Sequence, residues 1–247
     1  MTDPQRSDGH TPAHRPRVLV CDDETQILRA LRVILRDAGF EALPASTGEE
    51  ALDVAAVSRP EAGIIDLVLP DMDGIELCRR LREWTNIPLL VLSAVDDEDA
   101  KVRALAVGAD DYVTKPFGPR ELIARLQANM RRIEPDRDTP VITTGELSID
   151  LASRTVTVAG EEVRLTPTEF SLLALLARNR GRLMTHRDLL VSVWGAGYGD
   201  DTQVLRAHIA NLRRKLDHAG DEPVNGGAAR SGGYIRTDAG VGYRFAA

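Results

Sequence analysis

Five short apolar runs alternate with five amphipathic segments over residues 17–132, and this alternation restricts the fold more than any other feature of the chain. The apolar runs occupy 17–21, 40–45, 62–66, 88–92 and 111–113. Helical periodicity occupies 25–38, 47–57, 74–83, 97–107 and 119–132. Strands that alternate with helices predict an α/β domain with a five-stranded, doubly wound parallel sheet. The carboxyl ends of its strands lie at one edge, where such sheets bind ligands.

The chain after residue 132 has a different pattern, which predicts a second domain. Residues 133–144 are expected to be a linker, because they begin with the charged, proline-containing run IEPDRDTP. Short strands, helices that begin at Thr166 and Thr185, a helix over 202–218 and a terminal hairpin then predict an α+β domain over 145–247. Residues 1–16 hold three prolines and no periodicity, so they are expected to be a disordered arm.

The composition excludes several classes of protein. The chain of 247 residues has no apolar run near the ~18 residues that a membrane span needs, and its first residues have no apolar core typical of a signal peptide. Two cysteines, Cys21 and Cys78, cannot form a disulfide framework, so a cytoplasmic location is expected. Residues 1–140 hold 26 acidic and 18 basic residues, whereas residues 141–247 hold 12 and 13, which indicates two domains with different partners.

Polar residues follow four of the predicted strands. Asp22 and Asp23 follow the first strand, Asp66 ends the third, Ser93 ends the fourth and Lys115 ends the fifth. Two carboxylates ~4 Å apart repel by about 4 kcal/mol at an effective dielectric of 20, so three need cations beside them. Lysine supplies one charge, and an oxygen-only ligand set suits Mg²⁺. The cluster predicts a Mg²⁺-dependent phosphoryl-transfer site in which one carboxylate is the nucleophile.

Each of these residues has a simpler interpretation on its own. An acidic pair at a strand end is often a solvated loop terminus, and a lone serine or lysine at such a corner carries little information. Asp71 and Asp73 are expected to be turn residues before a helix at Gly74. The occurrence of all the polar groups at the ends of neighbouring strands is what favours a functional site.

The helix over 202–218 has two contrasting faces. Leu205, Ile209, Leu212 and Leu216 fall on one stripe, which predicts a buried side. The opposite side carries arginines and amides, which can contact guanine, adenine or phosphate groups. Such a face is often only solvated, but the preceding helix and the terminal hairpin predict a winged helix-turn-helix, whose third helix enters the major groove of DNA.

The first domain resembles the receiver domain of two-component response regulators, which has a flavodoxin-like fold. The resemblance rests on DDE at 22–24, Asp66 followed by LPDMDG, LSA at 92–94 and GADDYVTKPF at 108–117. It implies that Asp66 accepts a phosphoryl group from a sensor histidine kinase. It implies a Mg²⁺ site and a set of contacts to the phosphoryl group. The implied residues are Asp22, Asp23, Asp66 and the Val68 carbonyl for Mg²⁺; Lys115, across a cis peptide at Pro116, for the phosphoryl group; and Ser93 with Tyr112 as the switch pair.

The second domain resembles the effector domain of the OmpR/PhoB family, through LTPTEFSLLALL, RDLLVSVWG, LRAHIANLRRKLD and GVGYRF. The resemblance implies promoter DNA as a partner, and RNA polymerase through the loop 195–200. A wing-tip arginine of some members is Ala239 here, so base contacts by the wing are not expected. The chain looks most similar to the Kdp branch, which regulates potassium uptake. The implied DNA contacts are Arg206, His208, Asn211, Arg213, Arg214, Thr237, Tyr243 and Trp194.

The resemblance also implies a homodimer when Asp66 is phosphorylated. The family pairs charges across a two-fold receiver interface, and the matching pairs are Lys101 with Glu121, Asp111 with Arg125 and Asp110 with Arg132. The protein is then not an enzyme, apart from catalysing its own phosphorylation and dephosphorylation. Two alternatives stay open. One is a constitutive DNA-binding regulator with a silent receiver that is used for dimerisation. The other is a Mg²⁺-dependent phosphohydrolase, but such an enzyme needs an acid–base carboxylate at position 68, where this chain has valine.

Overall fold

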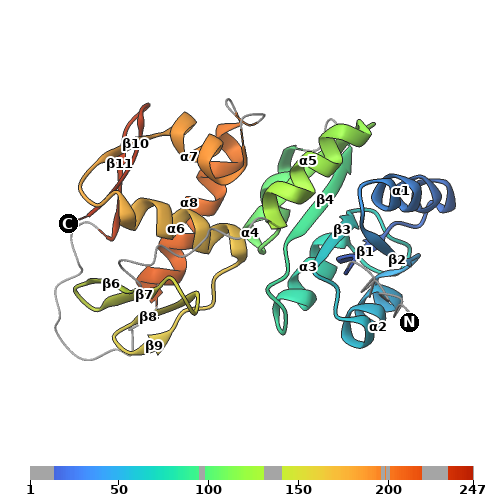
Figure 1. Cartoon of the computed structure of the whole chain (residues 1–247), viewed down its shortest axis with the longest axis horizontal. Helices are drawn as coiled ribbons and strands as arrows, with labels where there is room; N and C mark the ends of the chain where they lie inside the picture. Colours follow the sequence, from blue (N-terminus) through green and yellow to red (C-terminus); the bar gives the residue numbers. More distant parts are fainter. Residues whose placement is uncertain are drawn as a thin grey trace, which may run out of the picture.

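The computed structural model describes residues 14–94, 98–130, 141–195, 198, 201–218 and 233–246 in two halves that lie side by side (Figure 1). Residues 1–13 of the arm expected over 1–16 lie outside the described residues. None of the helices in the described ranges is long and apolar enough to cross a membrane.

The first half, the receiver half, is built on a parallel sheet in the order β2-β1-β3-β4-β5. Its strands are β1 (Arg17–Cys21), β2 (Glu41–Ala45), β3 (Ala62–Asp66), β4 (Leu89–Ala94) and β5 (Asp111–Lys115). Its helices are α1 (Thr25–Asp37), α2 (Gly48–Ser58), α3 (Gly74–Arg82), α4 (Glu98–Ala106) and α5 (Pro119–Met130). This arrangement confirms the doubly wound fold predicted from the sequence.

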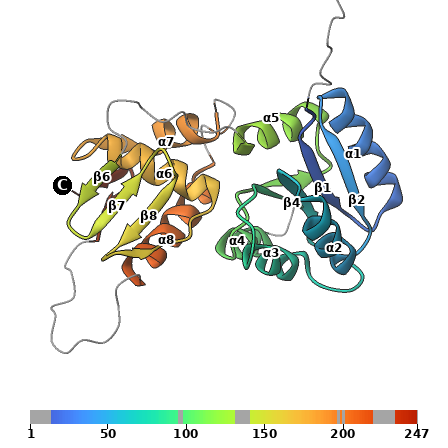
Figure 2. The same ribbon diagram turned by 60° about the horizontal axis from the view of Figure 1, so that its bottom comes forward.

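The central strands are apolar except near their ends, because both faces of the sheet are covered (Figure 2). Val18 and Val20 of β1 pack in one buried cluster with Leu31 of α1 and Leu122 of α5. Leu19 packs in the other cluster, which includes residues of α2, α3 and α4. Successive side chains of a strand point to opposite faces, so one five-residue strand contributes to both layers.

The second half, the effector half, contains two antiparallel sheets around three helices. The first sheet consists of β6 (Val141–Thr144), β7 (Leu147–Asp150), β8 (Thr155–Val158) and β9 (Glu161–Glu162). The helices are α6 (Pro167–Arg178), α7 (His186–Val193) and α8 (Thr202–His218). The second sheet has the order β10-β12-β11, with β10 (Leu183–Thr185), β11 (Ile235–Asp238) and β12 (Gly242–Phe245). This is a winged helix-turn-helix, with α8 as the recognition helix and the β11–β12 hairpin as the wing.

The linker expectation needs a correction at its end. Residues 141–144 form β6 and pair with β7 from Val141↔Asp150 to Thr144↔Leu147. The run VITT is rich in β-branched residues, which favour a strand once a partner strand is available. Residues 133–140 of the expected linker lie outside the described residues.

The two halves contact each other along α4, β5 and α5 of the receiver half. Helix α8 packs against α4, and α6 packs against α5 (Figures 1 and 2). One apolar cluster contains Ala104 and Leu105 of α4 together with Leu205 and Ile209 of α8. The recognition helix therefore lies against the receiver half in this conformation.

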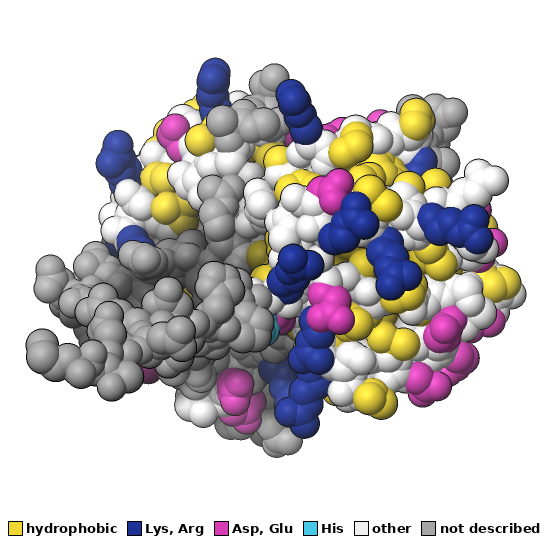
Figure 3. Space-filling view, turned by 45° about the vertical axis from the view of Figure 1, so that its right-hand side comes forward, with side chains coloured by type: hydrophobic (Ala, Val, Ile, Leu, Met, Phe, Trp, Pro, Cys, Tyr) yellow, Lys and Arg dark blue, Asp and Glu magenta, His cyan; other side chains and the backbone are white. Residues whose placement is uncertain are grey.

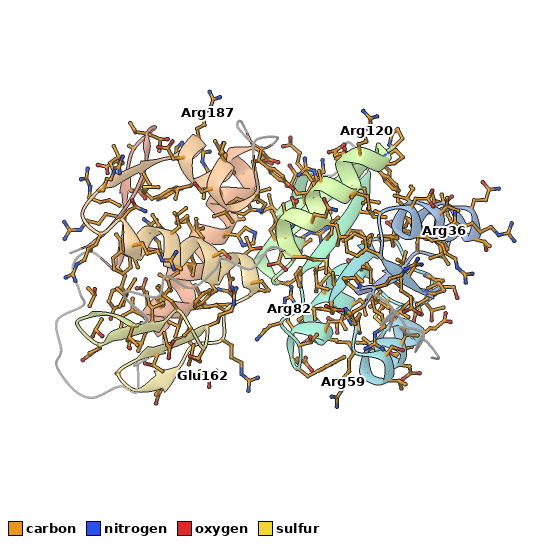
Figure 4. All side chains as sticks on the ribbon, viewed as in Figure 1. Arg36, Arg59, Arg82, Arg120, Glu162 and Arg187 are labelled. Carbon is orange, nitrogen blue, oxygen red and sulfur yellow. The ribbon has the colours of Figure 1, made fainter. Side chains whose placement is uncertain are left out.

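Charged side chains of both signs lie on the molecular surface (Figure 3). On the face shown in Figure 3, Lys and Arg side chains lie among hydrophobic ones, although the whole chain has a net charge of −7. Arg120 of α5 and Arg187 of α7 point away from the body of the protein (Figure 4).

Candidate phosphoryl site and recognition helix

The predicted acidic cluster forms at the carboxyl edge of the receiver sheet. Asp22 and Asp23 follow β1, and Asp66 is the last residue of β3. One carboxylate oxygen of each lies within 4.8 Å of those of the others. The Lys115 ammonium donates hydrogen bonds of 2.9 Å to both Asp22 and Asp66. Residues separated by up to 93 positions in the sequence therefore meet at one site.

The backbone around Asp66 is held closely by the turn into α3. A Cβ atom on Gly74 would overlap the carbonyl oxygen of Asp66 and lie 2.7 Å from the Cα of Leu67. Asp73 caps α3 by accepting a 2.8 Å hydrogen bond from the amide of Ile75. Asp71 accepts hydrogen bonds from the first amides of α2. These contacts confirm the turn roles expected for Asp71 and Asp73.

Burial and the neighbouring ammonium act in opposite directions on the acidic cluster. Burial raises the pKa of the Asp66 carboxyl, although hydrogen bonds and charge from Lys115 lower it. Burial disfavours the charged form of Lys115, but its hydrogen bonds to Asp22 and Asp66 outweigh this and raise its pKa. The site therefore holds a charged lysine beside a partly shielded carboxylate.

The donor set fits a hard divalent cation. Asp22, Asp23 and Asp66 offer only oxygen ligands, and Asp23 is exposed, so water can reach the cluster. The backbone of Val68 pairs with Asp73 just beyond the site, and its side chain is 75% exposed. A phosphohydrolase of this kind would need an acid–base carboxylate at position 68, and the valine there cannot supply one.

The predicted switch pair lies beside the cluster, but its two members face different surroundings. The Ser93 hydroxyl is buried and has no hydrogen-bond partner among the described residues. The Tyr112 hydroxyl points toward the effector half and donates a 3.1 Å hydrogen bond to Asp201. The peptide bond before Pro116 is cis, as the resemblance implied.

Helix α8 has the two faces predicted from the sequence, but its polar face is divided. Arg206 and Arg214 are exposed, whereas His208 and Asn211 are buried against the receiver half. The Nε2 atom of His208 lies 2.9 Å from the carbonyl oxygen of Asp110. The Asn211 amide donates a 2.7 Å hydrogen bond to the carbonyl oxygen of Leu105. Arg214, although exposed, donates a 3.3 Å hydrogen bond to the carbonyl oxygen of Ala106, so three of the expected DNA contacts are engaged by the receiver half.

The other expected DNA contacts lie at the wing or in the core. Arg213 of α8 donates hydrogen bonds to Thr237 and to the Ile235 carbonyl, so it joins helix and wing. Tyr243 is 5% exposed and lies near Arg213 and His186. Trp194 is 2% exposed and packs against His208, so its indole does not face solvent in this conformation.

The charges expected at a dimer interface are partly used within the chain. Arg125 pairs with Asp111 at 3.2 Å and with Glu121 at 3.0 Å. Lys101 lies over the Tyr112 ring at 5.2 Å. Asp110 pairs with Arg82 at 2.7 Å, and Arg132 lies outside the described residues.

The effector half adds further contacts to the same face. The Tyr198 hydroxyl donates a hydrogen bond to Asp111, and the Thr168 amide donates one to Asp110. Of the loop at 195–200, only Gly195 and Tyr198 are described, and Tyr198 is buried there. Thr168 and Asp201 were not predicted as interface residues, because no motif marks them.

The fold and site define a class of protein: a receiver domain joined to a winged helix-turn-helix domain. Residues 18–127 match the family described as response regulator receiver domain, and residues 160–245 match the family described as transcriptional regulatory protein, C terminal. The chain belongs to the response regulators, the phosphorylation-dependent DNA-binding regulators that combine these two domains.

Full-length relatives support this assignment. The transcriptional regulatory protein KdpE of Mycobacterium tuberculosis is 48% identical over 93% of this chain and 99% of its own length. The KDP operon transcriptional regulatory protein KdpE of Escherichia coli is 43% identical over 92% and 98%. A solved structure of a RitR mutant has a TM-score of 0.72 at 27% identity and covers 93% of this chain and 98% of its own.

Proposed function

We propose that the protein accepts a phosphoryl group on Asp66 from a sensor histidine kinase, dimerises, and binds promoter DNA of potassium-transport genes. The observation that carries the proposal is the cluster of Asp22, Asp23 and Asp66 with Lys115 Nζ at 2.9 Å from two of the carboxylates. The potassium assignment rests on the similarity to the two KdpE proteins.

Each residue of the cluster has a distinct task in the proposed transfer. An oxygen of Asp66 attacks phosphorus, a P–O bond forms, and the P–N bond to the donor imidazole breaks. Asp22 and Asp23, with Asp66 and the Val68 carbonyl, would hold Mg²⁺, which neutralises charge on the phosphoryl oxygens. Lys115 contacts one phosphoryl oxygen, and the Ser93 hydroxyl, which has no partner among the described residues, is available to another. The protein catalyses its own phosphorylation and dephosphorylation in this scheme.

The proposed DNA contact uses the recognition helix. Arg206 is exposed and can reach base edges or phosphates. His208, Asn211 and Arg214 contact carbonyl oxygens of the receiver half and become fully available only when α8 leaves it. Thr237 and Tyr243 at the wing and Trp194 near α7 complete the proposed surface. Phosphorylation is proposed to separate the halves through Ser93 and Tyr112.

Separation also frees the face needed for a dimer. Asp110, Asp111 and Arg125 contact the effector half or support residues that do. We propose that the same residues, with Lys101, Glu121 and Arg132, pair across a two-fold axis in the phosphorylated protein. The loop at 195–200 then becomes available to RNA polymerase.

Intact-mass measurement after incubation with acetyl phosphate tests the chemistry. Wild type and the control Asp53→Ala, an exposed carboxylate on α2, should each gain one phosphoryl group when Mg²⁺ is present. Asp66→Ala should gain none, and neither should wild type with chelator. A gain that persists in Asp66→Ala would remove the assignment of Asp66.

A second experiment tests the DNA and dimer steps. Phosphorylated wild type should elute as a dimer and select a specific duplex from random-sequence DNA. Recovered motifs should occur upstream of potassium-transport genes in the source genome. A wild type that binds DNA equally well with and without Asp66 phosphorylation would instead be a constitutive regulator with a silent receiver.

A further inference from the structure

The guanidinium of Arg213 bridges the recognition helix and the wing. Its Nε and Nη2 atoms donate hydrogen bonds of 3.1 and 2.8 Å to the carbonyl oxygen of Ile235. Nη2 also donates a 2.7 Å hydrogen bond to the hydroxyl of Thr237. The Cζ atom lies 5.8 Å from the centre of the Tyr243 ring. One side chain of α8 thus contacts both strands of the wing.

The wing strand that receives these bonds is an edge strand. In the order β10-β12-β11, β11 pairs only with β12, so its other edge has no strand partner within the described part of the chain. Edge carbonyls need another donor or water. Arg213 supplies that donor with a planar fork, a geometry that a lysine ammonium cannot reproduce.

Another arginine of the helix, Arg206, has a different environment. Arg206 lies two turns earlier on α8 and is exposed, whereas Arg213 is partly buried against the wing. A direct phosphate contact needs a free guanidinium, and Arg206 fits that requirement better. The Nε and Nη2 donors of Arg213 are already committed to strand β11 of the wing.

We infer that Arg213 is a positioning residue that fixes the wing at one orientation to the recognition helix. The inference rests on the proposed DNA-binding function. Helix and wing must reach their sites on DNA together, and a fixed orientation removes the entropy cost of aligning them during binding. Loss of Arg213 would therefore weaken the contacts that the uncharged wing residues Thr237 and Tyr243 make with DNA.

The test compares lysine and glutamine variants of the full-length, phosphorylated chain on the duplex selected by wild type. Arg213→Lys keeps the charge but loses the fork, so we expect it to weaken binding about tenfold, as much as Arg213→Gln. The slope of log K against log salt concentration should stay at the wild-type value for both, because no phosphate contact is lost. Arg206→Gln should lower the magnitude of that slope by about one, and Arg206→Lys should not.

Footprinting and exchange provide readouts that a general loss of stability would not reproduce. In the Arg213 variants, hydroxyl-radical protection should disappear at the wing side and persist at the recognition-helix side. Amide hydrogen exchange in the free chain should rise in β11 and β12 and stay unchanged in α8. Arg120→Gln, which removes an outward-pointing charge from α5, should match wild type in every assay.

The outcomes separate the inference from the function on which it rests. Near-wild-type binding by Arg213→Lys, with a reduced slope for Arg213→Gln, would show a direct phosphate contact and overturn the positioning role. Unchanged exchange in the wing would also overturn it. A wild-type protein that selects no duplex would overturn the proposed DNA-binding function itself, and the positioning role with it.

Discussion

The phenolic hydroxyl of Tyr112 donates a 3.1 Å hydrogen bond to the carboxylate of Asp201. Tyr112 lies on β5, three residues before the lysine of the acidic cluster, and Asp201 immediately precedes α8. The bond therefore joins the strand that ends at the phosphoryl site to the start of the recognition helix. Rotation of the Tyr112 side chain away from Asp201 would break this bond, so we expect the two sites to be coupled.

Removal of the Tyr112 hydroxyl should weaken the packing between the halves. A hydrogen bond of this kind contributes about 1 kcal/mol, so unphosphorylated Tyr112→Phe should bind the selected duplex about fivefold more tightly than wild type. Asp201→Ala should also bind more tightly. Its control is Asp217→Ala, which removes an exposed carboxylate near the other end of the same helix and so measures the effect of losing one negative charge. Fluorescence anisotropy measures these affinities, and unchanged affinity in Tyr112→Phe would contradict the coupling.

The buried carboxyl of Asp111 should make the packing of the halves depend on pH. Burial raises its pKa to about 6, although the charge of Arg125 and hydrogen bonds from Tyr198 and Asn129 lower it. Separation of the halves restores water and brings the pKa toward its ordinary 3.8. The packed form thus binds the proton more tightly. Its stabilisation by this group is complete below about pH 3.8 and is lost as the pH rises through about 6.

Small-angle scattering can measure this dependence. Between pH 7.5 and 5.5, wild type should become more compact relative to Asp111→Asn, which carries no titratable group at this position. The comparison isolates Asp111 from other titrating groups. Identical pH profiles for the two proteins would exclude Asp111 as the source.

Lys115 should compete with Mg²⁺ for the carboxylates. Its ammonium lies 2.9 Å from oxygens of Asp22 and Asp66, and repulsion between cations at such range amounts to a few kcal/mol even at an effective dielectric of 20. Lys115→Gln should therefore bind Mg²⁺ about tenfold more tightly while its phosphorylation slows. Isothermal titration calorimetry tests this, with Arg36→Gln as an exposed-cation control. Weaker Mg²⁺ binding in Lys115→Gln would contradict the proposed competition.

The contact at Gly74 predicts a large effect from a single methyl group. The added Cβ of Gly74→Ala would overlap the Asp66 carbonyl, and its three nearest neighbours are backbone atoms that cannot rotate away. We expect a loss of about 3 kcal/mol in the free energy of unfolding and slower phosphorylation. Gly118→Ala, where a Cβ meets nothing within 4 Å, should change little. Chemical denaturation compares the two, and equal stability would refute the steric argument.

The pair of Lys215 and Glu169 should stabilise the effector half. The ammonium lies 2.6 Å from a carboxylate that is fully buried, and the same oxygen accepts a bond from the Thr166 amide. Lys215→Met leaves that charge unpaired and should cost about 2 kcal/mol. The double variant Glu169→Gln/Lys215→Met should recover part of the loss. A double variant less stable than Lys215→Met would argue against an unpaired buried charge.

The acidic cluster could be predicted because its determinants are local. Each strand ends where its apolar run ends, and the parallel arrangement then brings Asp22, Asp66 and Lys115 to one edge. The caps of α2 and α6 are equally local, since Thr47 and Thr166 accept bonds from residues three positions later. Strands β6 and β10 departed from the sequence expectation, because strands of three or four residues depend on the partner beside them.

The surface that covers the recognition helix could not be predicted in the same way. The sequence determined two domains, the acidic cluster with its lysine and an amphipathic helix with a polar face, because hydrophobic periodicity and strand ends are properties of neighbouring residues. The tertiary structure alone decided that His208 meets Asp110 across 98 positions and that Tyr198 meets Asp111 across 87. Such contacts depend on the complementarity of two folded surfaces, and that complementarity leaves no periodic pattern along the chain.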